Sequence, residues 1–427
     1  MSYLKWDAAV PTTSAKQVFD PWKPGFLDIH HLYVGSSVST FIILPDSTTL
    51  LIDAGQVNLE KQRQWWKSLG PPYDKLKALD PVPIASKSPS EWIFDYMTEF
   101  WPSSKQRHNR TLDYLLATHF HSDHFGEPNN NNNLSAVSLS GIPWIASQLP
   151  IGKLVDRGYP QYDFPKDLRS AGDDNTKHYI DFVDTTIATK QSKISMEQFQ
   201  VGSKTQIRPL HGQQQEDLVI QVIKNNNLVV QNNDNDEATT TIAQINGTFL
   251  DEHGQWNENA LSAAFVIQYG DFRYYEGADQ EVVREKHGNT ILLDTIGPTA
   301  RAAGAVDVAS LNHHGHGVTA EFVDVMDPPV VVLQGWCSDQ PKSESVRLLQ
   351  SPSRQIFATH VFPERLNAMG PELARLFAST WGHVVVRVHP PAADDPQQPQ
   401  TYEIFVLDGQ RQLKSYHGPY TPRKKKH

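Results

Sequence analysis

Two pairs of short apolar runs, one pair in each half of the chain, predict β-hairpins. In each pair a polar turn separates two runs whose length suits a short buried strand. Each hairpin ends close to an aspartate that lies near a glycine, Asp53 in the first half and Asp279 in the second. The predicted strands are residues 39–43, 50–52, 263–269 and 272–275.

A further apolar run follows each hairpin and ends in a cluster of histidines. The run at 115–117 leads into Thr118-His119-Phe120-His121-Ser122-Asp123-His124. The run at 306–311 leads into Asn312-His313-His314. The order of hairpin, aspartate, strand and histidines therefore occurs twice, which indicates an ancient internal duplication.

The C-terminal part of the chain alternates between strand and helix patterns, which predicts a layered α/β sandwich. Earlier, Ser88 and Glu91 enclose a proline in the first helical position, so they predict a capping box at a helix start. Residues 142–260 are less regular. We interpret them as an insertion that covers the site, with a helix near 150–157. The other predictions are strands at 330–333 and 355–358, helices at 343–349 and 371–377, and a closing hairpin of 383–388 with 401–407.

The first histidine cluster carries the chemistry that is easiest to recognise. Imidazole nitrogen and carboxylate oxygen are ligands that suit zinc, iron or manganese. We expect His119 and His121 to bind one metal ion, and Asp123 and His124 to bind a second. A histidine-rich surface loop is the alternative interpretation, and the strand directly before the cluster argues against it.

This His-x-His-x-Asp-His string resembles the signature of the metallo-β-lactamase superfamily of metallohydrolases. The resemblance implies a four-layer αββα sandwich, with the insertion as a lid and the metal ions at strand ends between the halves. Flanking pieces look like the branch that includes ComEC domains and phosphorylcholine esterases, and the likeness runs from about residue 26 to 360. That branch typically has Gly-Gln-Gly-Asp where this chain has Gly35-Ser36-Ser37-Val38, which argues against a nuclease role. The flanking pieces are Asp28 to Gly35, Asn257-Glu258-Asn259 with Ser262, and Leu311 to Gly315.

The resemblance also implies roles for single residues. Asp279 would bridge the two ions, and Asp53 would orient the ligand loop without binding metal. Neighbouring side chains on an extended backbone point to opposite sides, so only one of His313 and His314 should bind metal. We expect His314 to be the ligand and His313 to donate to charge that develops on the substrate. Asp123 and His313 are the residues we assign to catalysis.

The third ligand of the first metal ion is the point at which this chain departs from many relatives, which place a histidine before the bridging aspartate. The region offers His178, His211 and His253. His211 is the candidate among them, because it follows Pro209-Leu210 and precedes a glycine, which suits a strand end. If none of the three binds, the first metal ion is weakly held or the enzyme works with one ion.

Composition narrows the class of protein. The chain has 427 residues and a net charge of −10, which disfavours a nucleic-acid backbone as partner. No apolar run approaches the roughly 18 residues of a membrane helix, and the start shows no signal-peptide core, so we expect a cytoplasmic protein. The single Cys337 excludes an intramolecular disulfide. Residues 1–26 are expected to form an N-terminal arm, and 27–420 the metal-binding domain.

We therefore predict a hydrolase with two metal ions, zinc first and manganese or iron as alternatives. Such a pair activates water and polarises the group under attack. The expected substrate is a phosphodiester or a phosphorylated small molecule, and a lactone or other acyl substrate is the alternative. A binding protein that has lost catalysis is a third hypothesis, which the intact ligand strings disfavour. Trp336, Trp381, Tyr159 and Tyr162 could form an aromatic pocket for a choline-like head, or could pack in the core.

Overall fold

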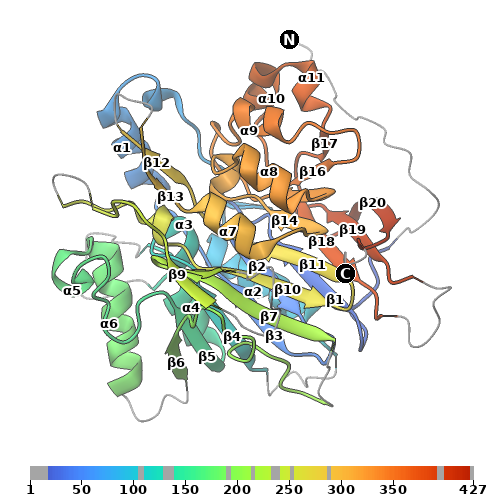
Figure 1. The fold of residues 1–427 in the computed structure, drawn as a ribbon, viewed down its shortest axis with the longest axis horizontal. Helices are drawn as coiled ribbons and strands as arrows, with labels where there is room; N and C mark the ends of the chain where they lie inside the picture. Colours follow the sequence, from blue (N-terminus) through green and yellow to red (C-terminus); the bar gives the residue numbers. More distant parts are fainter. Residues whose placement is uncertain are drawn as a thin grey trace.

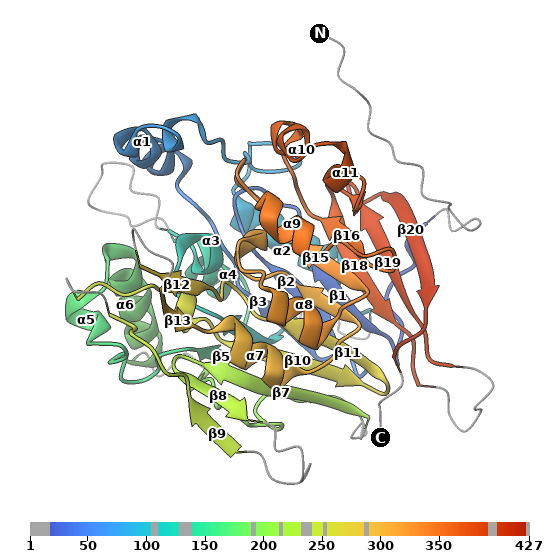
Figure 2. The ribbon, with the colours of Figure 1, turned by 45° about the horizontal axis from the view of Figure 1, so that its top comes forward.

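Two β-sheets face each other at the centre of the molecule. The computed structural model describes residues 18–103, 110–127, 139–188, 194–212, 217–231, 241–250, 254–285, 290–391 and 399–423. Within these residues there are two nine-stranded sheets and one small two-stranded sheet. Helices lie on the outer side of each large sheet (Figures 1 and 2).

The first sheet has the order β20-β19-β18-β1-β2-β3-β4-β5-β6. Strands β1, β2 and β3 pair antiparallel, and β3, β4, β5 and β6 pair parallel. The bounds are β1 Leu27–His31, β2 Thr40–Ile43, β3 Thr49–Ile52, β4 Leu112–Ala117, β5 Ile151–Asp156, β6 Ser195–Gln198, β18 His383–Val388, β19 Tyr402–Leu407 and β20 Leu413–Tyr420.

The second sheet has the order β17-β16-β15-β14-β11-β10-β7-β8-β9. Strands β7, β10 and β11 pair antiparallel, and β11, β14, β15 and β16 pair parallel. This is the pairing pattern of β1 to β6, so the topology supports the internal duplication. The bounds are β7 Leu218–Asn225, β8 Leu228–Gln231, β9 Thr241–Gln244, β10 Ala264–Tyr269, β11 Phe272–Glu276, β14 Val308–Ser310, β15 Val330–Leu333, β16 Gln355–Ala358 and β17 Phe377–Ser379.

Alternating side chains build three apolar layers from these sheets. In β4, Tyr114 and Leu116 point into the core between the sheets, whereas Leu115 and Ala117 face helices. Helices α2 (Pro89–Phe100), α4 (Gly141–Gln148) and α6 (Asp174–Ala188) cover the first sheet. Helices α7 (Ile296–Ala303), α8 (Ala320–Met326) and α9 (Ser343–Leu348) cover the second, as Figure 1 shows. The four-layer αββα sandwich predicted from the sequence is confirmed.

The remaining short elements lie at the ends and edges of the sandwich. Helix α1 projects from it in both views (Figures 1 and 2). These elements are α1 Leu59–Leu69, η1 Tyr73–Lys75, α3 Ser122–Phe125, α5 Leu168–Ala171, η2 Asn259–Leu261, β12 Val282–Arg284, β13 Ile291–Asp294, η3 His313–Gly315, α10 Pro363–Met369 and α11 Pro371–Ala374.

The region 142–260 differs most from its prediction. Strands β5 and β6 extend the first sheet, and β7, β8 and β9 belong to the second, so much of this region is part of the sandwich and not a lid. The helix expected near 150–157 is strand β5. Its apolar residues Ile151, Leu154 and Val155 have helical spacing, but parallel pairing on both sides of the strand overrides that preference. Edge strand β6 is largely polar and gave no clear pattern.

Two further differences are small. The helix expected at 371–377 ends at Ala374, and Phe377 begins strand β17. Of the predicted arm, residues 18–26 are described, and its Phe19 and Trp22 are buried. Among the described residues, no helix has both the length and the apolar character that a membrane crossing requires.

The predicted capping box of α2 is confirmed and can be tested. The Ser88 side chain accepts from the Glu91 N–H, and the Ser88 N–H donates to Glu91 Oε2 at 2.7 Å. Ser88→Ala should lower the free energy of unfolding by about 0.5–2 kcal/mol, because helix α2 loses the side chain that caps its N-terminus. Chemical denaturation measures this, and the exposed Ser68→Ala should change stability by less than about 0.5 kcal/mol. Equal losses in the two variants would contradict the cap's role.

Candidate metal centre

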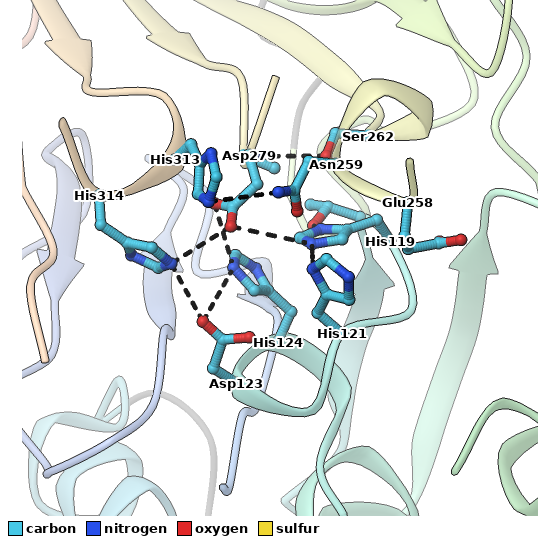
Figure 3. Close-up of polar contacts among 12 residues, drawn as sticks. His119, His121, Asp123, His124, Glu258, Asn259, Ser262, Asp279, His313 and His314 are labelled. Atoms are coloured by element: carbon cyan, nitrogen blue, oxygen red, sulfur yellow. Dashed lines mark hydrogen bonds and ion pairs between the residues drawn. The ribbon is translucent and has the colours of Figure 1, made fainter. Parts of the chain in front are cut away.

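A cluster of histidines and aspartates lies where the central strands of both sheets end. Strand β4 leads to His119 and His121, and helix α3 carries Asp123 and His124. From the second sheet, Asp279 follows β11 and His314 follows β14. These six side chains converge in Figure 3, so the two halves of the duplicated fold build one site.

One ligand group consists of Asp123, His124, Asp279 and His314, all buried, whose ligand atoms lie within 4.8 Å of one another. His314 Nε2 lies 3.0 Å from Asp123 Oδ2 and 3.2 Å from Asp279 Oδ2. His124 Nε2 lies 3.2 Å from Asp279 Oδ1. Two imidazoles and two carboxylates thus face a common centre.

A second group consists of His119, His121 and Asp279. His119 Nε2 lies 3.2 Å from His121 Nδ1 and 3.9 Å from Asp279 Oδ2. Asp279 therefore belongs to both groups, and its carboxylate lies between them (Figure 3). This is the position that a bridging ligand requires.

Contacts on the far side of two imidazoles direct their Nε2 atoms into the cluster. Asp53 Oδ2 lies 2.7 Å from His124 Nδ1 and also accepts from the hydroxyl of Thr118. His314 Nδ1 lies 2.8 Å from the carbonyl oxygen of Gln334. Such partners fix the tautomer and the orientation of metal-binding histidines. The structure places Asp53 where the sequence analysis expected an orienting carboxylate.

The charges of the cluster fit a cation site. Burial lowers the pKa of His314, but the carboxylates of Asp279 and Asp123 outweigh burial and raise that pKa to about 10. Burial raises the pKa of Asp279, but His314 and His124 hold it well below its usual range. Among the described residues, buried His124 Nε2 makes no hydrogen bond and faces Asp279 Oδ1 only as an ion pair at 3.2 Å. Buried carboxylates with imidazole nitrogens directed at the same centre are the donor set that zinc, iron and manganese use.

The backbone at the second histidine cluster is strained in order to aim His314. His313, His314 and Gly315 have φ values of 47°, 52° and 78°, and a left-handed conformation is costly for non-glycine residues. The turn, not the extended backbone assumed from the sequence, separates the two histidines. His314 points at the carboxylates, whereas His313 Nε2 lies 3.2 Å from Asn259 Nδ2 and His313 Nδ1 lies 2.9 Å from Glu281 Oε2.

The structure does not bring His211 into the cluster. His211 Nε2 lies 3.1 Å from Asp113 Oδ1, and the backbone N–H of His211 donates to Asp46 Oδ2 in the turn of the β2–β3 hairpin. That turn is at the opposite end of β3 from Asp53, so the prediction that His211 completes the first metal site is corrected. His178 lies on α6 and lines a cavity of about 360 Å³ with Phe125 and Tyr179, also apart from the ligands. His253 lies outside the described residues.

The suggested aromatic pocket is not a single site. The Tyr162 ring is fully buried under the helices of the first sheet and its hydroxyl donates to Asp156. Trp381 is 40% exposed and lies beneath the Lys414 ammonium. Of the four aromatic residues named, Trp336 contacts the cluster of candidate ligands, where its Nε1–H donates to Asp123 Oδ2 at 2.9 Å.

Trp336 and Glu258 are supporting residues to which the sequence analysis gave no such role. Trp336 stacks on Trp66 of α1 with ring centroids 6.3 Å apart. Glu258 Oε1 accepts from the N–H of Phe120, which lies between His119 and His121. Neither contact has a local pattern in the sequence, because the partners are 213 and 138 residues apart.

Comparison with known proteins agrees with this architecture. Residues 32–127, which include Asp53 and the His-x-His-x-Asp-His string, match the model of the Metallo-beta-lactamase superfamily. Together with the two packed sheets and their covering helices, this match identifies the fold as the metallo-β-lactamase fold. No curated protein matches the chain.

The solved structures that the chain matches include a candidate metal-dependent hydrolase from Parabacteroides distasonis. It is 11% identical, with a TM-score of 0.31, and the match spans 78% of this chain and 93% of that one. Another is Zn²⁺-bound PqqB from Methylobacterium extorquens, 11% identical, with a TM-score of 0.31 and a match over 82% of this chain and 86% of that one.

The contact between Trp336 and Asp123 generates a test of the site. Trp336→Phe keeps an aromatic ring beside Trp66 but removes the N–H that fixes Asp123, so metal affinity should fall about 10–100-fold. Calorimetric titration of metal-free protein with zinc measures the change. Trp66→Phe, which alters the same stack without touching Asp123, is the matched control and should keep the wild-type affinity. Unchanged affinity in Trp336→Phe would show that Asp123 needs no such support.

Proposed function

We propose that this protein is a metal-dependent hydrolase that binds two divalent cations, zinc in the first place and manganese or iron as alternatives. The observation that carries the proposal is the Asp279 carboxylate, which both ligand groups share. One group, with Asp123, His124 and His314, would hold one cation. The other, with His119 and His121, would hold the second. The intact groups disfavour a binding protein that has lost catalysis.

Bound cations of this kind lower the pKa of coordinated water toward about 7 and stabilise negative charge on the group under attack. The residues of this chain supply the position and the charge balance. Asp279 fixes the separation of the two ligand groups, and Asp123 is held by Trp336 and His314. Asp53 and Gln334 orient His124 and His314.

The proposed substrate is a phosphodiester or a phosphorylated small molecule. Attack on phosphorus places charge on non-bridging oxygens, and a pair of cations can hold such oxygens. A lactone or another acyl substrate would develop charge on a single carbonyl oxygen. No described contact favours the acyl substrate, so it serves as the second arm of the test.

The experiment has two parts. Elemental analysis of protein never exposed to chelator should find about two transition-metal ions per chain. Turnover of bis-p-nitrophenyl phosphate should then exceed that of a panel of γ-lactones. Absence of metal above background would overturn the proposal, and faster lactone hydrolysis would reassign the substrate to the acyl class.

The bridging carboxylate gives a direct prediction. Asp279→Asn should nearly abolish turnover and lower metal content, because a neutral amide cannot neutralise both cations as a carboxylate can. The loss of metal affinity should exceed the roughly 10–100-fold effect of changing a residue that only orients a ligand.

The control for this variant is Asp271→Asn. Asp271 is an exposed aspartate in the turn of the same hairpin that delivers Asp279, so its substitution should leave both turnover and metal content unchanged. Full activity with full metal content in Asp279→Asn would remove the second half of the chain from the assigned site.

A further inference from the structure

The ligand group of His119, His121 and Asp279 has fewer protein ligands than the other group. His211, which was expected to complete this group, lies beside Asp113 and not in the cluster. We infer that Asn259 completes this group, with its side-chain oxygen as a ligand of the cation between His119 and His121. The inference rests on the proposed function, because it requires that the cluster binds metal.

Hydrogen bonds hold the segment around Asn259 against both ligand-bearing loops. The Phe120 N–H donates to Glu258 Oε1 at 2.8 Å, and the Ala263 N–H donates to the Thr118 carbonyl at 3.0 Å. The Asp279 N–H donates to Ser262 Oγ at 3.2 Å. Residues on both sides of Asn259 are thus tied to the backbone of the histidine string, and Ser262 is tied to the bridging aspartate as well.

Glu258 is the anchor of this segment. Its carboxylate receives Arg157 Nε and Nη2, each at 2.6 Å, and the Arg157 guanidinium lies 4.5 Å from the Phe120 ring centre. Arg157 is fully buried, so the pair is shielded from water. In Figure 3 the Glu258 side chain points away from the ligands, and the side chain of Asn259 lies between His313 and His119.

His313 and Glu281 determine which end of the Asn259 amide faces the cluster. Glu281 Oε2 lies 2.9 Å from His313 Nδ1 without hydrogen-bond geometry, and its negative charge favours the proton of a neutral ring on Nδ1. Nε2 is then an acceptor, and its neighbour at 3.2 Å is the amide nitrogen of Asn259. The amide oxygen therefore turns toward the ligand group. His313 Nε2 already faces the Asn259 amide, so His313 acts here as a positioning residue for Asn259 and not as a donor to substrate.

The side-chain oxygen of Asn259 has no hydrogen-bond partner among the described residues. The side chain is 7% exposed, and its Oδ1 is buried without a hydrogen bond. Leaving a buried carbonyl oxygen unpaired is destabilising, and coordination to a cation would satisfy it. An amide oxygen is a hard, neutral ligand of the kind that suits manganese at least as well as zinc.

The test compares three variants with wild type after metal has been removed with a chelator. Circular dichroism checks that each metal-free protein keeps its fold. Calorimetric titration with Mn²⁺ gives stoichiometry and affinity, and electron paramagnetic resonance detects spin coupling between two neighbouring Mn²⁺ ions. Asn259→Ala should bind only one cation, or bind the second with an affinity that falls by more than the roughly 10–100-fold expected for a residue that only orients a ligand. The spectrum of coupled Mn²⁺ ions should then be lost.

Asn259→Asp preserves the shape of the side chain and adds charge to the oxygen, so it should bind two cations, one of them about tenfold more tightly. It also keeps the inference testable if Asn259→Ala does not fold. Asn225→Ala is the matched control, because Asn225 is likewise buried with an unbonded Oδ1 but donates to the Arg157 and Phe199 carbonyls. It should bind both cations with wild-type affinity.

The outcomes separate this inference from the proposed function. Two cations in wild type, with unchanged affinity and coupling in Asn259→Ala, would overturn the role of Asn259 and leave the hydrolase intact. Unchanged affinity in Asn259→Asp would overturn it equally. No bound cation in wild type would overturn the proposed function itself, and the role of Asn259 with it.

Discussion

The carboxylate of Asp279 is buried between three imidazoles, and its negative charge is the constraint around which the site is built. A buried ionised carboxylate is costly unless charges and hydrogen bonds compensate it. His124 and His314 lie 3.2 Å from its two oxygens, and Asp53 and Gln334 hold those imidazoles in place from behind. Against the effect of burial, the carboxylates raise the pKa values of His124 and His314 above the usual range of histidine, which favours their protonated forms without metal. Metal binding would displace those protons, which couples cation affinity to the same charge balance.

The duplicated topology brings these charges together, and the backbone is strained at the residues that carry or adjoin the ligands. Asp53 and Ala278 close the corresponding hairpin strands with φ values of 57° and 49°, and His314 adopts 52°. Left-handed backbone at non-glycine residues persists only when the surrounding structure imposes it. Here the paired strands on either side impose it, so the sandwich sets the positions of the ligands and the loops only carry them.

Local patterns in the sequence were sufficient for the hairpins and for the ligands that follow strands directly. His119 to His124 are six consecutive residues, and their order alone predicted a metal site. Contacts between distant segments could not be predicted in this way. Trp336 reaches Asp123 across 213 residues, and β5 resembled a helix until its pairing with β4 and β6 was known. The wrong choice of His211 has the same origin, because a histidine before a glycine does not reveal whether a strand precedes it, and His211 lies between β6 and β7.

The two ligand groups differ in negative charge, so the two cation positions are not equivalent. The group with His124 and His314 has two carboxylates, Asp123 and Asp279, whereas the group with His119 and His121 has only its share of Asp279. A neutral amide at Asn259 would keep that difference, and a carboxylate there would remove it. The cation beside His119 would then be held less tightly and be less neutralised by protein ligands. Less neutralisation by the protein leaves more positive charge to attract an anionic substrate, which suits a phosphodiester better than a neutral lactone.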